Sequence, residues 1–124
     1  MNDYKKLEVW KESVNLVTEI YFLTNNFPER EKFGFINQIN RSAVSIPSNI
    51  AEGAGRISKN EFVQFLGYAI ASSYELETQL IIAFNLKFIS TEQKDEIIEK
   101  LSTIQRKVYS LIKSLRNQSK IPTT

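Results

Sequence analysis

The helical pattern of this sequence is clearest over residues 58–93, which read SKNEFVQFLGYAIASSYELETQLIIAFNLKFISTEQ. Ser58 and Glu61 have the spacing of a capping box, in which a serine hydroxyl and a glutamate carboxylate satisfy free backbone donors at a helix N-terminus. The same spacing recurs at Ser90 and Gln93. Between the two boxes apolar residues occur on nearly every side of a helix. We therefore predict a long helix that begins after Ser58 and ends near residue 86, and another that begins after Ser90.

Two further helices are predicted before this stretch. Residues 6–24 carry apolar residues alternately three and four positions apart, and the segment from Asn25 to Pro28 ends the pattern. Residues 31–53 place isoleucines on one face, with Pro47 inside the segment. Because Pro47 has no N–H to donate to the carbonyl of Ala43, we expect the second helix to be kinked there.

The fourth helix follows the second capping box, and its apolar residues keep a heptad spacing from position 97 to position 115. With 4 glycines and 3 prolines in 124 residues, the chain has few other places to turn. Short connections between long amphipathic helices favour antiparallel neighbours. The predicted fold is all-α: an up-down-up-down antiparallel four-helix bundle over residues 1–116, followed by a disordered tail over 117–124.

The composition excludes much enzyme chemistry. The chain has no cysteine, and it has no histidine. Cysteine or histidine nucleophiles, an imidazole base and the usual zinc ligands are therefore absent, as are the Glu-x-x-His pairs of di-metal bundles. We expect a protein that is not an enzyme and needs neither metal nor cofactor. No apolar run is long enough for a signal peptide or a membrane span, so the expected location is cytoplasmic, without membrane contact.

Charge is distributed unevenly along the chain. Residues 1–99 hold 10 basic and 14 acidic side chains, whereas residues 100–124 hold 6 basic side chains and no acidic one. At 100° per residue, four of these form a stripe opposite the apolar face of the fourth helix, and two lie on its flank. The stripe comprises Arg106, Lys113, Arg116 and Lys120; the flank comprises Lys100 and Lys107. Such a stripe suits a phosphate backbone, but it is also typical of a solvated face whose cations favour a helix C-terminus.

A second polar cluster lies on the second helix, opposite its isoleucines. It consists of Arg41, Ser45, Ser48, Glu52 and Arg56, with Asn49 at its border. Glu52 and Arg56 form a favourable i,i+4 pair, and we expect Arg41 to reach a carboxylate such as Glu75 or Glu77. One interpretation is an internal network that fixes the register of the helices. The other is a surface for a ligand or a partner.

The third helix has more apolar surface than one bundle needs, which predicts a homo-oligomer. The alternative is that this helix simply occupies the most central position. Aromatic residues lie on the apolar stripes, which favours core or interface positions over base stacking. They are Trp10, Tyr21, Phe62, Phe65, Tyr68 and Tyr74.

The central segment resembles a known bacterial family. Residues 41–58 read RSAVSIPSNIAEGAGRIS, and EF, FL and YELETQ follow at positions 61, 65 and 74. Together with LEVWK at position 7 and Phe27-Pro28, these motifs are similar to the four-helix-bundle family named for proteins encoded in intervening sequences of 23S ribosomal RNA genes. Lys87-Phe88 departs from a Gly-Tyr that is common there, and Ala71 stands where the family often has glycine.

The resemblance implies a homopentamer. It also implies kinship with accessory proteins of diversity-generating retroelements, which bind nucleic acid and a reverse transcriptase. It carries no catalytic residues. Its signature positions, which we expect to be mostly structural, are Arg41, Ser45, Pro47, Asn49, Glu52, Gly53, Arg56, Ser58, Glu61, Glu75 and Glu77.

The sequence thus leads to two functional hypotheses. The first is a non-enzymatic homo-oligomer that binds nucleic acid, with RNA preferred, through the basic face of the fourth helix. The second is a protein-interaction scaffold, or an accessory subunit, without direct nucleic-acid binding. A steep dependence of binding on salt concentration would favour the first.

Overall fold

A computed structural model describes residues 3–119, and these residues are helical throughout apart from short connections. The elements are η1 (Tyr4–Lys6), α1 (Glu8–Thr24), η2 (Glu29–Glu31), α2 (Phe35–Ala54), α3 (Lys59–Asn85) and α4 (Thr91–Ser119), where η denotes a short 3-10 helix. The described residues contain no strand. The predicted class, an all-α four-helix bundle, is confirmed.

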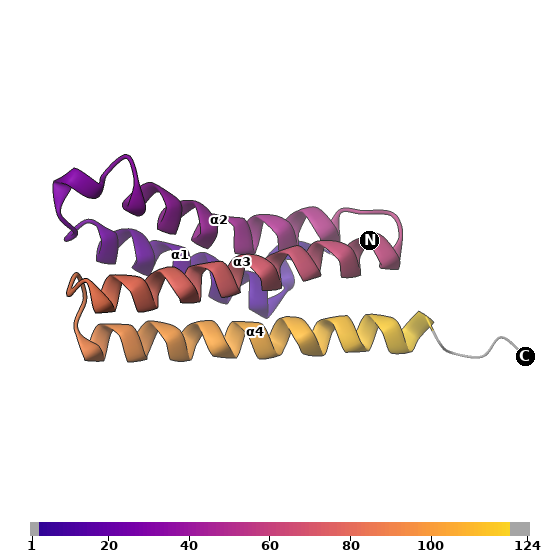
Figure 1. Ribbon diagram of the computed structural model, residues 1–124. Coiled ribbons are helices and arrows are strands. Elements are labelled where there is room, and N and C mark those ends of the chain that lie inside the picture. Colours follow the sequence, from indigo (N-terminus) through magenta and orange to yellow (C-terminus); the bar gives the residue numbers. More distant parts are fainter. Residues whose placement is uncertain (1–2, 120–124) are drawn as a thin grey trace, which may run out of the picture.

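The four long helices lie side by side (Figure 1). The α1–α2 and α3–α4 connections are at one end of the molecule, and the α2–α3 connection is at the other. Each helix packs against two others, in the seams α1–α2, α2–α3, α3–α4 and α1–α4. This arrangement makes α4 a neighbour of both α3 and α1, and leaves its remaining face to solvent.

Both predicted capping boxes begin helices. The backbone N–H of Glu61 donates to Ser58 Oγ at 3.1 Å, which caps α3. At α4 the box is reciprocal, since Gln93 N–H donates to Ser90 Oγ at 3.1 Å and Ser90 N–H donates to Gln93 Oε1 at 2.8 Å. Each cap satisfies donors that a helix start leaves free.

The second helix differs in its bounds from the sequence prediction. The segment expected to begin at residue 31 has η2 at its start, and α2 begins only at Phe35, after Gly34. Gly34 has φ −115° and ψ −99°, a conformation outside the helical region, which separates the two elements. Pro47 lies inside α2, which continues as one helix to Ala54. A bend at Pro47 stays a prediction.

The third helix ends in a Schellman motif without a glycine. Phe88 N–H donates to the Ala83 carbonyl and Lys87 N–H to the Phe84 carbonyl, each at 2.9 Å. Lys87 itself has φ 66°, the left-handed conformation that glycine usually supplies at this position. The C-terminal motif therefore forms although Lys87 stands where the resembled family commonly has glycine.

The core runs the length of the bundle and contains apolar residues from all four long helices. Fully buried side chains include Leu16, Ile20, Ile39, Ile50, Leu66, Leu76, Leu80 and Leu101. Within residues 3–119, no buried side-chain nitrogen or oxygen lacks a hydrogen-bond partner. The polar groups inside the bundle are thus satisfied, as native cores require.

The last helix extends beyond its predicted end. The sequence places the end of the domain at residue 116, whereas α4 continues through Ser119. Residues 120–124 lie outside the described part of the chain. No helix among residues 3–119 has the length and apolar character that crossing a membrane requires.

Candidate nucleic-acid interface

Three cations on the outer face of α4 have no acidic partner. Arg106, Lys113 and Arg116 are all exposed, and within residues 3–119 none of them forms an ion pair. Arg106 donates instead to Ser102 Oγ at 3.0 Å and to Thr103 Oγ1 at 3.1 Å, both on its own helix. These hydroxyls hold the guanidinium without neutralising it, so its charge stays available to an anion.

The two flanking lysines have a different role. Lys100 donates to the carboxylate of Glu19 on α1 and, at 3.3 Å, to Glu96 on its own helix. Lys107 donates to Glu12 on α1 and, at 3.3 Å, to Glu8. The structure therefore uses both lysines to join α4 to α1, and neither presents an unpaired charge.

The pKa values of these groups follow from the pairing. The hydrogen bond to Glu19 raises the pKa of Lys100 above its usual range, and the hydrogen bond to Glu12 raises that of Lys107. On the acidic side, the hydrogen bond and the charge of Lys107 lower the pKa of Glu8. Each shift favours the charged form of its group, as an opposite charge nearby does.

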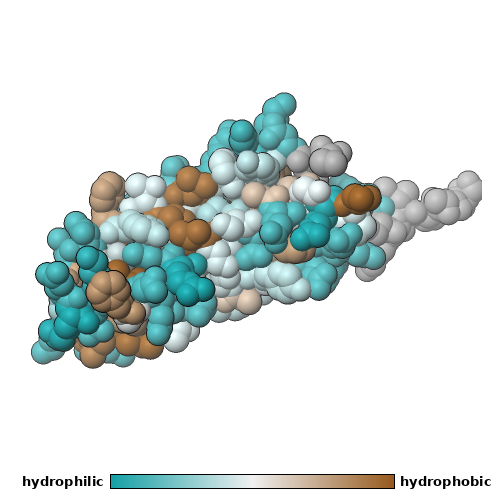
Figure 2. Space-filling view, turned by 90° about the horizontal axis from the view of Figure 1, so that it is seen from above, coloured by the Kyte–Doolittle hydropathy of each residue, from teal (hydrophilic) through white to brown (hydrophobic). Residues whose placement is uncertain are grey.

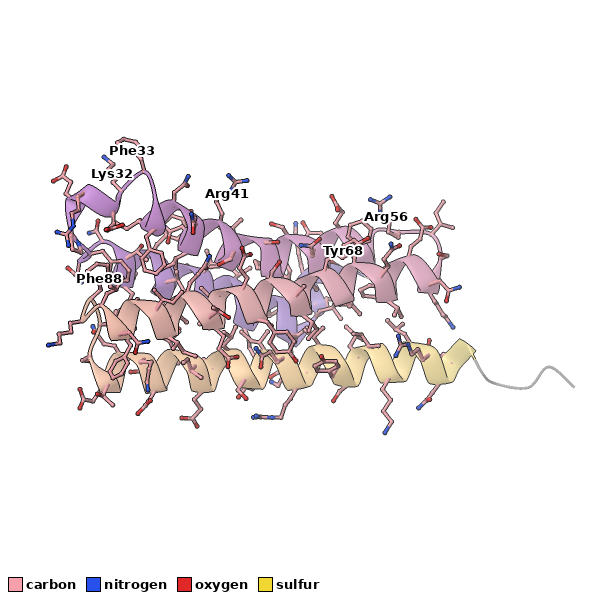
Figure 3. The ribbon with its side chains drawn as sticks, in the orientation of Figure 1. Lys32, Phe33, Arg41, Arg56, Tyr68 and Phe88 are labelled. Carbon is pink, nitrogen blue, oxygen red and sulfur yellow. The ribbon has the colours of Figure 1, made fainter. Side chains whose placement is uncertain are left out.

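The predicted basic surface is thereby reduced to the stripe itself. Nitrogen-tipped side chains project from the side of α4 that faces away from α3 (Figure 3). Of the stripe, Arg106, Lys113 and Arg116 are described, whereas Lys120 lies outside the described residues. A spacing of seven and then three residues keeps the three on one face of the helix.

A groove runs between α1 and α4 beside the ion pairs that Lys100 and Lys107 form with α1. It has a volume of about 510 Å³ and is lined by Glu12, Asn15, Leu16, Glu19, Lys100, Thr103 and Ile104. Its charged groups already form ion pairs across the seam, Glu19 with Lys100 and Glu12 with Lys107. The described residues contain no group of three or more acidic side chains that could hold a metal ion.

The comparisons with known proteins agree with this architecture. The model of the family described as 23S rRNA-intervening sequence protein matches residues 5–110. This chain belongs to that family. It is also similar to the crystal structure of a protein of unknown function from the S23 ribosomal protein family of Bacteroides thetaiotaomicron. That match has a TM-score of 0.78 and 27% sequence identity, and covers 85% of this chain and 95% of the other. No curated protein matches the sequence.

In this member of the 23S rRNA-intervening sequence protein family, part of the polar cluster predicted on the second helix lies in the α2–α3 seam. Ser45 Oγ and Ser72 Oγ are 2.8 Å apart, and Asn49 Nδ2 donates to the Ser45 carbonyl at 2.8 Å. Ser45 and Asn49 are half-buried. These two residues form hydrogen bonds inside the seam, as the interpretation as an internal network expects, whereas Ser48 is exposed.

The most buried hydrogen bond of this seam was not predicted from the sequence. Ser42 Oγ donates to Gln79 Oε1 at 2.7 Å, and both residues are buried. Gln79 lies within the YELETQ motif that carries the family resemblance. A glutamine on an otherwise apolar helix face is the signal that predicts such a buried partner.

Gly53 accounts for the close approach of the two helices. A Cβ at this position would lie 2.7 Å from Phe65 Cβ and 3.0 Å from Phe62 Cδ1. Real Cβ atoms do not come so close to a neighbour, so any other residue would force α2 and α3 apart. The close approach of the helices thus gives a packing reason for glycine at this signature position.

Arg56 forms two ion pairs and a cation–π contact at the end of the same seam. Its guanidinium lies 3.9 Å from Glu52 and 4.0 Å from Glu61, and stacks over the Phe65 ring at 4.5 Å from the centroid. The predicted Glu52–Arg56 pair is therefore confirmed. These contacts fix the α2–α3 connection to the body of the bundle.

The prediction for Arg41 is wrong. Its side chain is exposed and points away from the bundle (Figure 3), and within residues 3–119 it forms no ion pair. Glu77, one of its expected partners, accepts a hydrogen bond from Gln105 of α4 at 3.0 Å. The other, Glu75, is exposed. Helical periodicity gave the face of each residue but not the neighbouring helix toward which that face turns.

Apolar side chains also reach the surface of the bundle. Figure 2 views the molecule from above α2 and shows apolar patches between hydrophilic ones. On α3 the exposed apolar side chains are Tyr68 at 45%, Tyr74 at 47%, Ile81 at 43% and Ile82 at 41%. Of the aromatic residues expected in the core or an interface, Phe62 is buried and Trp10 and Phe65 are half-buried, whereas Tyr21, Tyr68 and Tyr74 are exposed.

Proposed function

We propose that this chain is a non-enzymatic homo-oligomer that binds nucleic acid, preferably RNA, through the outer face of α4. The observation that carries the proposal is the contrast between two sets of cations on one helix. Lys100 and Lys107 are neutralised by α1, whereas Arg106, Lys113 and Arg116 are exposed and unpaired within the described residues. Exposed cations along one helix face suit the regularly spaced charges of a phosphate backbone.

Association of several copies would strengthen this surface. The net charge of one chain is only +2, so a single copy has a weak long-range field. Copies arranged around an axis would present the three cations repeatedly, and the number of phosphate contacts would rise with the number of copies. The pentamer implied by the resemblance would present the surface five times.

The apolar side chains on α3 support an interface between copies. Tyr68, Ile82 and Leu86 lie on the side of α3 toward α2, where Val44 is also exposed. We expect Ile82→Glu to lower the oligomeric mass measured by light scattering. Ile57→Glu is the matched control, because Ile57 is 97% exposed but lies outside α3. Equal masses for wild type and Ile82→Glu would exclude this interface.

The description of the family supports RNA as the nucleic acid. It connects these proteins with an intervening sequence of 23S ribosomal RNA. Structured RNA is therefore the first probe to use. Sequence-specific recognition is not expected, because arginine and lysine contacts to phosphates read charge and shape.

The test is binding of a structured RNA, followed by fluorescence anisotropy over a series of salt concentrations. Wild type is compared with a triple variant, Arg106→Gln, Lys113→Gln and Arg116→Gln, after confirmation that both have the same oligomeric mass. The control variant removes the same charge from exposed lysines elsewhere, by Lys11→Gln, Lys32→Gln and Lys59→Gln. We expect steep salt dependence in wild type and control, and a shallower slope with weaker binding in the triple variant.

Two outcomes would contradict the proposal. One is that wild type does not bind RNA even at low salt. The other is that both triple variants weaken binding equally, which would indicate a general charge effect. In either case the alternative, a protein-interaction scaffold, is favoured by the surface around Arg41, whose unpaired guanidinium and exposed neighbour Val44 lie on α2.

A further inference from the structure

Two tyrosines connect α3 to α4 beside the basic stripe. The hydroxyl oxygens of Tyr74 and Tyr109 are 3.0 Å apart, so one donates to the other across the seam. Despite this contact the side chains remain 47% and 49% exposed. Tyr74 was expected in the core or an interface, and Tyr109 was not singled out from the sequence at all.

Two other tyrosines of the bundle pack against a neighbouring ring, whereas Tyr74 and Tyr109 contact each other through their hydroxyls. The Tyr68 ring packs edge-on against Phe65 at 5.3 Å, and Tyr4 packs against Trp10 at 5.1 Å. For Tyr74 and Tyr109, the part of the chain that the structure describes provides neither a ring nor a cation in stacking contact. Large, half-exposed aromatic surface without such a partner is available to a planar ligand.

The charges around Tyr109 come from the basic stripe. Arg106 lies three residues before it, Lys113 four residues after it and Arg116 seven residues after it, which places all four on one face of α4. The hydrogen bond with Tyr109 raises the pKa of Tyr74, and the charge of the nearby Glu77 adds to this shift. Because Glu77 belongs to α3 and accepts a hydrogen bond from Gln105, an anion would bind on the α4 side of the pair.

We propose that Tyr109, with Tyr74 beside it, stacks an unpaired base of single-stranded RNA whose phosphates are bound by Arg106 and Lys113. This inference rests on the proposed function and specifies its ligand. Every base has a π-face, so stacking on an exposed aromatic ring beside cations is a sequence-tolerant mode of single-strand binding. In a duplex the bases are already stacked on each other, and only the phosphate contacts would remain.

The experiment compares three RNA probes of equal length by fluorescence anisotropy at one salt concentration: a single-stranded oligouridine, an abasic strand and a duplex. The variants are Tyr109→Ala, which removes the ring, and Tyr109→Phe, which removes only the hydroxyl. Tyr21→Ala is the matched control, because Tyr21 on α1 is also 47% exposed but lies away from the stripe. Circular dichroism and oligomeric mass establish that each variant is folded and assembled.

We expect Tyr109→Ala to weaken oligouridine binding by about 5-fold or more. Binding of the duplex and of the abasic strand should not change in this variant, and Tyr109→Phe and Tyr21→Ala should bind oligouridine as wild type does. Equal oligouridine affinities of Tyr109→Ala and wild type would overturn the inference. The inference would also be overturned if Tyr109→Ala lost duplex binding as strongly as oligouridine binding. The proposed function would survive both results if the triple variant of Arg106, Lys113 and Arg116 lost binding to all probes, and it would fail together with the inference if wild type bound no probe.

Discussion

The α2–α3 and α1–α4 seams hold the same bundle together by different means. Between α2 and α3 the helices approach closely at Gly53, and the hydrogen bond between Ser42 and Gln79 is buried. Between α1 and α4 the polar contacts include three ion pairs of two partly exposed lysines, Lys100 and Lys107, with a groove beside them. Apart from the ion pairs of Arg56 at its end, the first seam depends on shape and on neutral hydrogen bonds, and the second on charges that solvent screens.

This difference separates structural residues from candidate functional ones. The family resemblance is concentrated in the α2–α3 region, where substitution would disturb packing. The cations proposed to bind RNA belong to α4, where the sequence of the outer face is not constrained by close contacts. A comparison of the two seams therefore predicts large effects on stability from α2–α3 and small, salt-dependent effects from α1–α4.

The largest effect is expected at Gly53. Gly53→Ala places a Cβ 2.7 Å from Phe65 Cβ, so α2 or α3 must shift. We expect a loss of about 2–3 kcal/mol in the free energy of unfolding, typical of overpacking in a close interface. The measurement is urea denaturation followed by circular dichroism.

Gly67 provides the control for this substitution. It lies inside α3, and a Cβ there would meet nothing within 4 Å. Gly67→Ala should therefore increase stability by about 0.5–1 kcal/mol, because alanine favours the helix more than glycine does. A loss of stability in both variants would show that the close approach at Gly53 is not the cause.

The second prediction concerns the buried hydrogen bond of the same seam. Ser42→Ala leaves Gln79 Oε1 buried without its donor, and should reduce the free energy of unfolding by about 1–2 kcal/mol. The double variant Ser42→Ala with Gln79→Leu should recover part of this loss, because both polar groups are then gone. If the two single effects simply add in the double variant, the hydrogen bond contributes nothing of its own.

The sequence predicted the helices well because the signals for their starts are local. The boxes at Ser58 and Ser90 each satisfy donors within four residues, so their effect does not depend on the rest of the fold. The start of α2 was placed too early because η2 also has a helical pattern, and only the conformation of Gly34 separates the two. The helical extension through Ser119 was missed because residues 117–119 carry no apolar periodicity.

Contacts between helices were harder to predict than the helices themselves. Periodicity gives the face on which a residue lies, but not which helix covers that face. Arg41 was therefore assigned a carboxylate that it does not contact, and Lys100 and Lys107 were grouped with the phosphate-binding residues although α1 neutralises them. Tyr109 was not predicted because it lies between the charged residues of α4 and outside the apolar positions that keep the heptad spacing.

The third prediction tests the α1–α4 seam. Lys100→Gln and Lys107→Gln each remove a cation that two carboxylates surround. We expect a smaller loss of stability than at Ser42, and we expect it to disappear in concentrated salt, since partly exposed ion pairs are screened. The loss in Ser42→Ala should not depend on salt. A salt-independent loss in the lysine variants would mean that their alkyl chains, and not their charges, hold this seam.

The smallest effect is a change in the pH dependence of stability. Lys107 holds the pKa of Glu8 below its ordinary value of 4.5, so Glu8 binds protons less readily in the folded than in the unfolded chain. This pair therefore stabilises the protein above that value, and its contribution is lost as the pH falls through the lowered pKa of the folded state.

The raised pKa of Lys107 acts at alkaline pH. Its contribution to stability is present below 10.5 and is lost as the pH rises through the raised pKa. Lys107→Gln removes the raised lysine pKa and also the main cause of the lowered pKa of Glu8. Its stability difference from wild type should therefore be constant near neutral pH and should narrow in acid and in strong alkali. Ser42→Ala changes no titrating group, so its stability difference from wild type should be the same at every pH. The measurement is the urea midpoint of wild type and of both variants from acid to alkaline pH. A difference from wild type that changes with pH in Lys107→Gln, but not in Ser42→Ala, would show that the pH dependence of stability belongs to the α1–α4 seam. If both differences vary with pH in the same way, the two seams do not differ in this respect.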